Sequence, residues 1–269
     1  MDYLQAVILA AVQGLTEFLP VSSSAHLILV PKLLGWPDQG LAFDVAVHVG
    51  TLLAVLLYLK GLIVKMTRQW VAGWRSLTWQ AEGLLAWWVV LATIPVGLVG
   101  LVAGDWIELN LRSALVIAAA TFVFAIVLGW ADTRANANHG QLTTLTLKRA
   151  IWVGMAQTLA LIPGTSRSGV TMTAMLALGY SRVASAQFSF LLAVPAIALP
   201  GLLKSHELMS SPAQVQWQVL LVGVAVSALI ALLCMRVFMR FVEQVGMRPF
   251  VYYRIVLAGV IVLLFGSAL

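Results

Sequence analysis

Long apolar stretches separated by short polar connections make up nearly the whole chain. Six of these stretches approach the ~20 residues that a helix needs to cross about 30 Å of hydrocarbon. They run from Leu41 to Leu59, Gly83 to Ala103, Ser113 to Gly129, Ala186 to Leu203, Trp217 to Val237 and Phe250 to Leu269. The pattern predicts about six transmembrane helices in an all-α polytopic membrane protein.

Two further apolar stretches are broken near their middles. Residues Tyr3 to Leu34 are interrupted at Pro20, and Ala150 to Leu178 at Pro163, each proline being followed by Ser, Thr or Gly. The halves are too short to cross a bilayer, so we expect two re-entrant helical hairpins. Non-helical backbone at membrane depth is tolerated where it is buried in protein or lines a wet cavity. The two breaks therefore predict a polar site at the place where they meet.

Composition agrees with a bilayer as the solvent. Hydrophobic residues make up 61% of the 269 residues and charged residues 10%, against about 25% charged residues in soluble domains. No loop is long enough to hold a separate core, so we expect one membrane domain over residues 1–269 and no signal peptide. Cys234 is the only cysteine, which excludes an internal disulfide and thiolate metal clusters, and we expect it in the core.

Basic residues indicate the orientation, because cytoplasmic loops are enriched in Lys and Arg. With six crossings and two hairpins, twelve of the sixteen basic residues fall on one side, which is then the cytoplasm. These are Lys60, Lys65, Arg68, Arg75, Arg134, Lys148, Arg149, Arg182, Arg236, Arg240, Arg248 and Arg254. The opposite loops carry Asp105, Glu108, Arg112, Lys204 and Glu207, and both termini. The charge of +6 is spread over short loops rather than gathered in a stripe, so we expect no nucleic-acid partner.

The two halves of the chain resemble each other. A shift of 143 residues places Pro20-Val21-Ser22-Ser23 on Pro163-Gly164-Thr165-Ser166, and Asp44 on Gln187. The first hairpin should enter from outside and the second from inside, as an inverted repeat requires. We therefore predict repeat halves of about 1–132 and 147–269.

The first break contains the motif Gln13 to His26. Gln13 and Glu17 are four residues apart on one helix face and can direct oxygens at one cation or one water. Ser22, Ser23 and Ser24 supply hydroxyl and backbone N–H donors where a new helix begins, which favours an anion. The alternative is that these serines only cap the helix. His26 follows within about a turn.

The second break contains the motif Pro163 to Thr171. Thr165, Ser166 and Ser168 add hydroxyl donors, and the glycines let the backbone approach a ligand closely. Arg167 is the decisive residue, because a charged arginine near the bilayer centre costs about 2.5–3.5 kcal/mol and normally has an anionic partner. Its planar fork suits a phosphate or a carboxylate. The alternative is a purely structural ion pair with Glu17.

Other polar residues are weaker candidates. Asp44 and its repeat mate Gln187 each open a span and are candidates for the polar cavity. His48 is interpreted as a satisfied core histidine, and His139 and His206 as loop residues. We interpret Trp70, Trp74, Trp87 and Trp88 as interfacial anchors.

The segments QGLTEFLPVSSSAH and PGTSRSGVT resemble the two signature segments of the bacterial undecaprenyl-diphosphate phosphatase family, the bacitracin-resistance type. QFSFLLAVP is similar to a third family segment, and the resemblance covers nearly the whole chain. It implies a multi-pass inner-membrane enzyme that hydrolyses undecaprenyl diphosphate to undecaprenyl phosphate and inorganic phosphate. That reaction recycles the lipid carrier for the cell wall and confers bacitracin resistance. It further implies dependence on a divalent cation, Mg²⁺ or Ca²⁺, and an active site facing the periplasm.

Family residues carry over onto six positions of this chain. They are Glu17, Ser23 and His26 from the first segment and Ser166, Arg167 and Thr171 from the second. Two positions depart from the usual pattern, because Gln13 and Gln187 stand where many members carry Glu. Glutamine keeps an oxygen ligand but loses the charge, which bears on metal affinity and pH dependence. The family's first pattern admits Gln.

As a mechanistic hypothesis, Arg167 and the two serine-rich turns hold the diphosphate, with a cation near Gln13 and Glu17. Ser23 is the preferred nucleophile, activated by Glu17 or His26. Direct attack by His26, or by water that His26 activates, fits the same residues. The substrate-binding candidates are Ser22, Ser24, Thr165, Ser166, Ser168 and Thr171.

The competing functional class is a transporter or flippase of a phosphorylated lipid, because paired broken helices in inverted repeats are also typical of carriers. Beyond a polyprenyl diphosphate and membrane lipid, a homodimer is left open as a partner arrangement.

Overall fold

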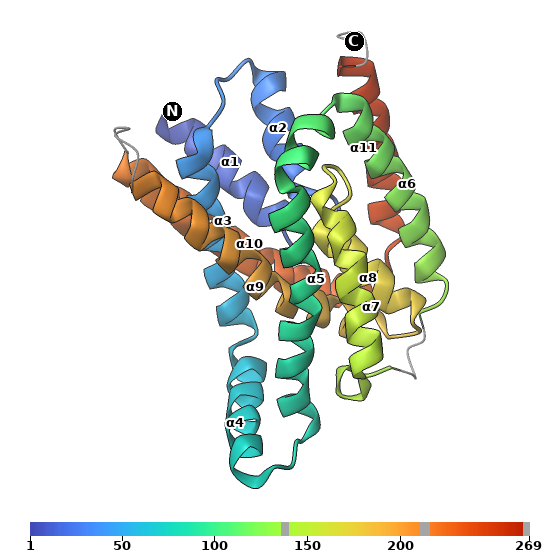
Figure 1. The fold of residues 1–269 in the computed structure, drawn as a ribbon. Coiled ribbons are helices and arrows are strands. Elements are labelled where there is room, and N and C mark those ends of the chain that lie inside the picture. The colour runs from blue at the N-terminus through green and yellow to red at the C-terminus, as the bar shows by residue number, and fades with distance from the viewer. Residues whose placement is uncertain (136–139, 210–215, 266–269) are drawn as a thin grey trace.

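The computed structural model describes residues 1–135, 140–209 and 216–265, and every regular element in these ranges is helical (Figure 1). In the first half these are α1 (Tyr3–Thr16), α2 (Ser23–Leu34), α3 (Gly40–Tyr58), α4 (Lys60–Ser76), α5 (Ala81–Asn110) and α6 (Ala114–Asp132). In the second half they are η1 (Leu142–Thr144), α7 (Leu147–Gln157), η2 (Thr158–Leu161), α8 (Arg167–Ala177), α9 (Arg182–Met209), α10 (Trp217–Gln244) and α11 (Arg248–Phe265).

Six of the described helices are long and apolar enough to cross a membrane, as the hydropathy pattern predicted. The candidate spans are Gly40–Tyr58, Ala81–Ile107, Ala114–Asp132, Arg182–Lys204, Trp217–Gln244 and Arg248–Phe265. They match the six predicted stretches to within several residues at each end. Residues 266–269 of the last predicted span lie outside the described residues, as do His139 and the side chain of His206.

The two broken stretches form helical hairpins that enter from opposite ends of the molecule. Helix α1 runs from the N-terminal end of the molecule to its middle, and α2 returns to that end (Figure 1). Helix α7 runs to the middle from the opposite half, and α8 returns to that half (Figure 1). The breaks meet in the middle, where Ser168 Oγ donates a hydrogen bond to the Leu19 carbonyl at 2.7 Å. This arrangement agrees with the two predicted re-entrant hairpins.

The two breaks share an unusual backbone conformation. Ser22 and Ser166 are the N-cap residues of α2 and α8, and their φ angles are 73° and 71°. Pairing these two serines gives a repeat offset of 144 rather than 143. The same offset places Gln13 on Gln157, and both side chains are fully buried. The inverted repeat and its boundaries at 132 and 147 stay predictions.

The polar stretch after the first span is a helix, not the loop that the basic residues indicated. The chain bends at Leu59, whose φ and ψ are −93° and 10°, and continues as α4, which packs against α5 (Figure 1). Trp70, Trp74 and Trp87 cluster there with Trp79. Trp88 instead donates its ring N–H to the Leu145 carbonyl at 3.0 Å.

Arg254 was expected beside a cytoplasmic loop, but it lies fully buried in α11. Its Nη1 donates to the Pro20 carbonyl at 3.3 Å, its Nη2 to the carbonyls of Gly164 and Thr165, both at 3.0 Å, and its Nε to the Thr121 carbonyl at 3.2 Å. The expectation was wrong because the turns left by the two breaks expose carbonyls that attract a buried cation. Arg254 therefore binds the backbone of both breaks at once.

Two smaller features complete the packing. Gly164 has a φ of +92°, and a Cβ there would lie 2.4 Å from the Ile117 carbonyl oxygen, so only glycine fits this turn. Cys234, expected in the core, is only half-buried, and its thiol donates to the Leu15 carbonyl.

Candidate functional site

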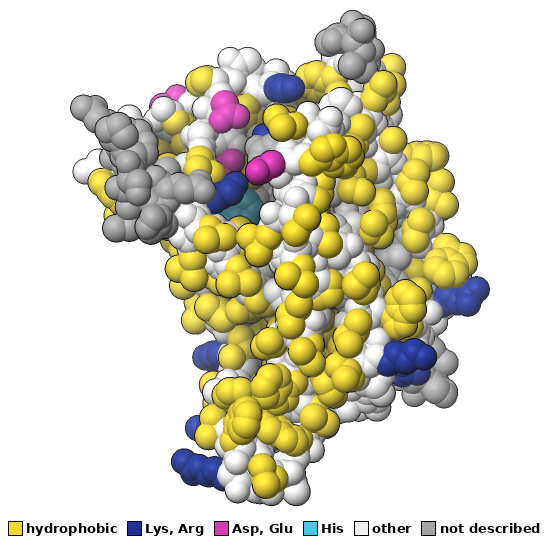
Figure 2. All heavy atoms as spheres, viewed as in Figure 1, with side chains coloured by type: hydrophobic (Ala, Val, Ile, Leu, Met, Phe, Trp, Pro, Cys, Tyr) yellow, Lys and Arg dark blue, Asp and Glu magenta, His cyan; other side chains and the backbone are white. Residues whose placement is uncertain are grey.

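A polar cavity of about 340 Å³ lies where the two breaks meet helices α3 and α9. It opens toward the end of the molecule that carries the N-terminus, where Figure 2 shows acidic, basic and histidine side chains around a hollow in a largely apolar face. Its polar lining residues are Glu17, Ser22, Ser23, Ser24, Asp44, His48, Ser166, Arg167, Ser168 and Lys204. The polar site predicted at the meeting of the breaks is present in the fold.

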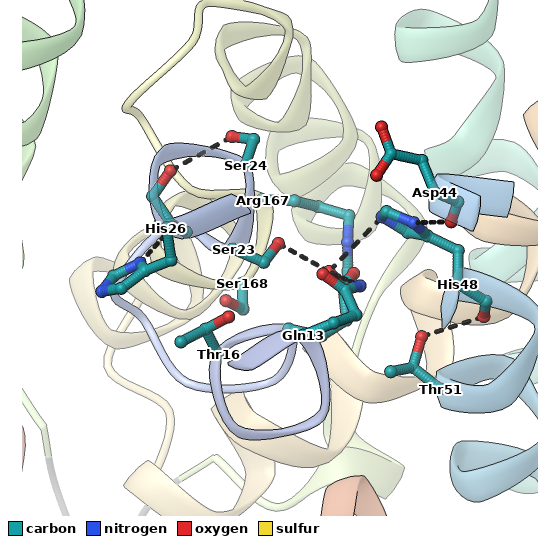
Figure 3. Close-up of polar contacts among 12 residues, drawn as sticks. Gln13, Thr16, Ser23, Ser24, His26, Asp44, His48, Thr51, Arg167 and Ser168 are labelled. Atoms are coloured by element: carbon teal, nitrogen blue, oxygen red, sulfur yellow. Dashed lines mark hydrogen bonds and ion pairs between the residues drawn. The ribbon is translucent and has the colours of Figure 1, made fainter. Parts of the chain in front are cut away.

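Glu17 contacts four polar side chains at this site, and Figure 3 labels all four: Gln13, Ser23, His48 and Arg167. Its Oε1 accepts a hydrogen bond from Arg167 Nη2 at 3.0 Å, and its Oε2 accepts from Ser23 Oγ at 2.7 Å and from Gln13 Nε2 at 3.0 Å. The His48 ring nitrogen Nε2 lies 3.8 Å from the same Oε2. The side chain of Glu17 is 7% exposed. A nearly buried carboxylate thus accepts hydrogen bonds from a hydroxyl, a guanidinium and an amide, and an imidazole lies close to it.

The Arg167–Glu17 ion pair bears on the structural alternative. The guanidinium donates to Glu17 and, through Nη1, to the Ser189 carbonyl at 3.2 Å. Both partners line the cavity. An arginine has five N–H donors, so these two contacts do not exhaust it. The pair holds Arg167 in place and leaves it able to bind an anion in the cavity.

The N-terminal ends of α2 and α8 both contribute to the cavity wall through Ser22–Ser24 and Ser166–Ser168. The N–H groups of a helix's first turn lack intrahelical partners and favour an anion. Ser166 caps α8, since its Oγ accepts from Gly169 N at 3.1 Å, whereas Ser22 makes no such cap bond. The capping alternative, which concerned the first break, is therefore wrong for Ser22.

His26 and His48 lie opposite to expectation: His26 was expected in the site and His48 in the core. His26 does not line the cavity, and its ring bonds to the Ser22 carbonyl through Nδ1 and to the Tyr253 hydroxyl through Nε2. Figure 3 shows it pointing away from Arg167. His48, interpreted as a core histidine, lines the cavity instead. Its spacing of four residues from Asp44 puts both on one helix face, a signal that could have placed it correctly.

The remaining candidates divide into lining and supporting residues. Asp44 lines the cavity and accepts from Gln39 at 2.9 Å. Thr165 and Thr171 are fully buried behind it, and Thr171 Oγ1 donates to Ser189 Oγ at 2.7 Å. Gln187 is half-buried in α9 and does not line the cavity. Lys204, assigned to an outer loop by the sequence, lies at the cavity in α9.

Gln13 and Glu17, the expected cation ligands, are in contact, but Glu17 lines the cavity whereas Gln13 is fully buried and does not. Gln13 Nε2 donates to Glu17, while its Oε1 is buried and has no hydrogen-bond partner in the described part of the chain. The described residues contain no group of three or more His, Cys, Asp and Glu side chains that could hold a metal ion. Mg²⁺ is commonly held by one or two carboxylates together with substrate phosphates. The Glu17 carboxylate on the cavity wall fits such a shared site, and the buried Gln13 oxygen without a partner is the candidate for a second ligand.

Comparison with known proteins shows similarity over nearly the whole chain. The family model described as bacitracin resistance protein BacA matches residues 6–260. The undecaprenyl-diphosphatase of Chromohalobacter salexigens is 50% identical over 263 residues, which cover 98% of each chain. That of Saccharophagus degradans is 52% identical over 262 residues, 96% of this chain and 97% of the relative.

A third relative is undecaprenyl-diphosphatase 2 of Stutzerimonas stutzeri. It is 51% identical over 269 residues, which cover 99% of this chain and 100% of the relative. All three relatives carry the name of a phosphatase, which supports the enzyme interpretation over the carrier alternative.

Proposed function

Because the chain belongs to the bacitracin resistance protein BacA family, we propose that its polar cavity hydrolyses undecaprenyl diphosphate to undecaprenyl phosphate and inorganic phosphate. The observation that carries the site assignment is the contact of Ser23 Oγ with Glu17 Oε2 at 2.7 Å, beside Arg167 on the cavity wall. A hydroxyl bonded to a carboxylate is an activated nucleophile, and an adjacent guanidinium is a phosphate ligand.

Ser23 attacks the terminal phosphorus and Glu17 accepts its proton. The Ser23 Oγ–P bond forms as the bridging P–O bond breaks, and undecaprenyl phosphate leaves with the bridging oxygen. Water then cleaves the phosphoserine, releases inorganic phosphate and regenerates the hydroxyl. His48, 3.8 Å from Glu17 Oε2, is positioned to pass the proton on. His26 acts indirectly, by holding the Ser22 carbonyl and with it the serine turn.

The diphosphate is held by donors from both breaks. Arg167 and the serines at the starts of α2 and α8 line the cavity, and the exposed Lys204 adds positive charge to its wall. Bound Mg²⁺ or Ca²⁺ would supply further charge neutralisation on the phosphate oxygens, with Gln13 and Glu17 as its protein ligands.

The proposed location is the bacterial inner membrane, with the cavity facing the periplasm. The cavity opens toward the end that carries the N-terminus, and α4, with Lys65, Arg68 and Arg75, forms the opposite end (Figure 1). Basic residues mark the cytoplasmic side. The enzyme would thus release phosphate outside the cell and leave the lipid monophosphate in the membrane as a carrier for cell-wall synthesis. The absence of a nucleic-acid partner and the homodimer stay predictions.

The test is phosphate release from undecaprenyl diphosphate by purified protein in detergent. We expect Glu17→Gln, which removes the proposed base, to lower the rate about 10²–10⁴-fold. Ser23→Ala, which removes the proposed nucleophile, should lower it at least as much. Thr67→Ala, a hydroxyl removed from the exposed face of α4, should leave the rate unchanged. Rapid quenching with substrate labelled in the terminal phosphate should trap phosphate on Ser23. Folded wild-type protein that binds the lipid but releases no phosphate would overturn the function, and label on His26 would overturn the nucleophile.

A further inference from the structure

An apolar groove of about 490 Å³ lies beside the catalytic cavity, between helices α5 and α9. The two spaces share Ala160, Arg167, Ala196 and Pro200 as lining residues. Arg167 therefore stands at their junction, with a polar chamber on one side and an apolar groove on the other. A molecule with a phosphate head and a hydrocarbon tail could occupy both at once.

The outer rim of the groove reaches the surface that faces lipid. Leu101 of α5 and Leu199 and Leu203 of α9 are 79%, 52% and 61% exposed, and all three line the groove. Both helices are candidate membrane spans. The groove therefore connects the phosphate-binding cavity to the bilayer.

Two glycines on α5 keep this groove open. A Cβ at Gly97 would meet no heavy atom within 4 Å, and one at Gly100 would meet only Leu161 at 3.8 Å. Some other glycines serve close helix packing instead, such as Gly14, where a Cβ would lie 2.8 Å from the Ser227 carbonyl oxygen. Gly97 and Gly100 both line the groove, and a side chain at either position would extend into it.

We propose that this groove binds the proximal isoprene units of the substrate's polyprenyl chain, an assignment that rests on the proposed diphosphatase function. The groove has the size of a small-molecule pocket, which is about 300–1,000 Å³. It holds the start of the chain, and the rest lies in the bilayer. Apolar walls hold the first units beside Arg167, so that the terminal phosphate reaches Ser23 while the tail stays out of the polar cavity.

The test fills the groove with a side chain. Gly97→Phe puts a ring into the open space, and Gly104→Phe is the matched control, because Gly104 lies on the same helix, also has no heavy atom near its Cβ position and does not line the groove. We compare kcat/KM for undecaprenyl diphosphate and for a five-carbon prenyl diphosphate. Displacing about two buried methylene groups from the site corresponds to about a tenfold loss.

We expect Gly97→Phe to lower kcat/KM for the long substrate about tenfold or more, mainly through KM, and to leave the short substrate within about twofold. Gly104→Phe should change neither. Equal losses on both substrates, or no loss on the long one, would overturn the groove assignment. Failure of wild-type protein to hydrolyse either substrate would instead count against the proposed function.

A second measurement decides the groove without hydrolysis. A polyprenyl phosphate with a photoreactive group on its first isoprene units is cross-linked to wild-type protein, and the labelled peptides are mapped. We expect label on α5 and α9, lost in Gly97→Phe and kept in Gly104→Phe. Label spread over all lipid-facing helices, or concentrated on α10, would reject the groove.

Discussion

Replacing Arg254 by methionine tests whether one buried guanidinium holds the two broken helices in register. Arg254 is fully buried and donates hydrogen bonds to the carbonyls of Pro20 in the first break and of Gly164 and Thr165 in the second. Methionine is apolar, unbranched and adaptable, so it fills much of the same space without a donor. The change therefore removes the hydrogen bonds with little loss of packing.

The magnitude follows from which carbonyls are left without a donor. In the described part of the chain, the carbonyls of Pro20 and Thr165 accept only from Arg254, whereas that of Gly164 also accepts from Thr121 Oγ1 at 3.2 Å. Each orphaned buried acceptor costs about 1–3 kcal/mol, so the loss is about 2–6 kcal/mol. Relief from burying the guanidinium charge opposes this loss, which places the expected value toward the lower end.

The assay combines thermal unfolding in detergent with phosphate release. We expect Arg254→Met to unfold at a lower temperature and to lose about 10²-fold in rate, because a shift of about 1 Å between reacting groups costs that much. Arg254→Lys keeps the charge but lacks the planar fork. Its unfolding temperature and rate should fall between those of the wild type and Arg254→Met. Arg248→Met, which removes an exposed arginine from the same helix, serves as the control. Arg254→Met protein with wild-type stability and rate would refute the reasoning.

Three further predictions concern the cavity itself. Ser168→Ala removes the hydrogen bond to the Leu19 carbonyl, and thermal unfolding should show a loss of about 0.5–1.5 kcal/mol; unchanged stability would mean that the breaks do not support each other there. Chelation of divalent cations should abolish phosphate release, and Gln13→Ala should raise the Mg²⁺ concentration for half-maximal rate, because its free Oε1 is the proposed ligand; an unchanged titration curve argues against that ligand. His48→Ala should lower kcat about 10²-fold or more and change the pH profile, whereas a loss confined to KM would make the imidazole a binding group only.

Hydropathy and motif spacing predicted much of the fold because the bilayer imposes a simple local rule. A stretch of about 20 apolar residues must be a helix to satisfy its backbone in hydrocarbon, so all six spans could be read from single segments. Pro20 and Pro163 marked the breaks by the same local logic. The acidic and basic residues within those breaks, Glu17 and Arg167, indicated the site because charges at membrane depth require a function or a partner.

Hydropathy misread the stretch that became α4. Lys60–Ser76 is too polar for a span and too regular for a loop, and the neighbouring α5 supplies the surface on which it packs. Hydropathy reports the solvent that a segment prefers, and it does not report a neighbouring helix.

The choice of groups in the cavity was decided only by tertiary packing. His26 and His48 are both compatible with a site histidine in sequence, but the rotation of α2 turns the first toward Tyr253 while α3 turns the second toward Glu17. Arg254 is bound by carbonyls from three separate segments of the chain, and no local pattern contains that information. By itself the sequence determined which segments enter the membrane and where they break, because those depend on transfer from water to lipid. Which side chains face one another inside was decided by helix packing, because that depends on contacts between residues far apart in the chain.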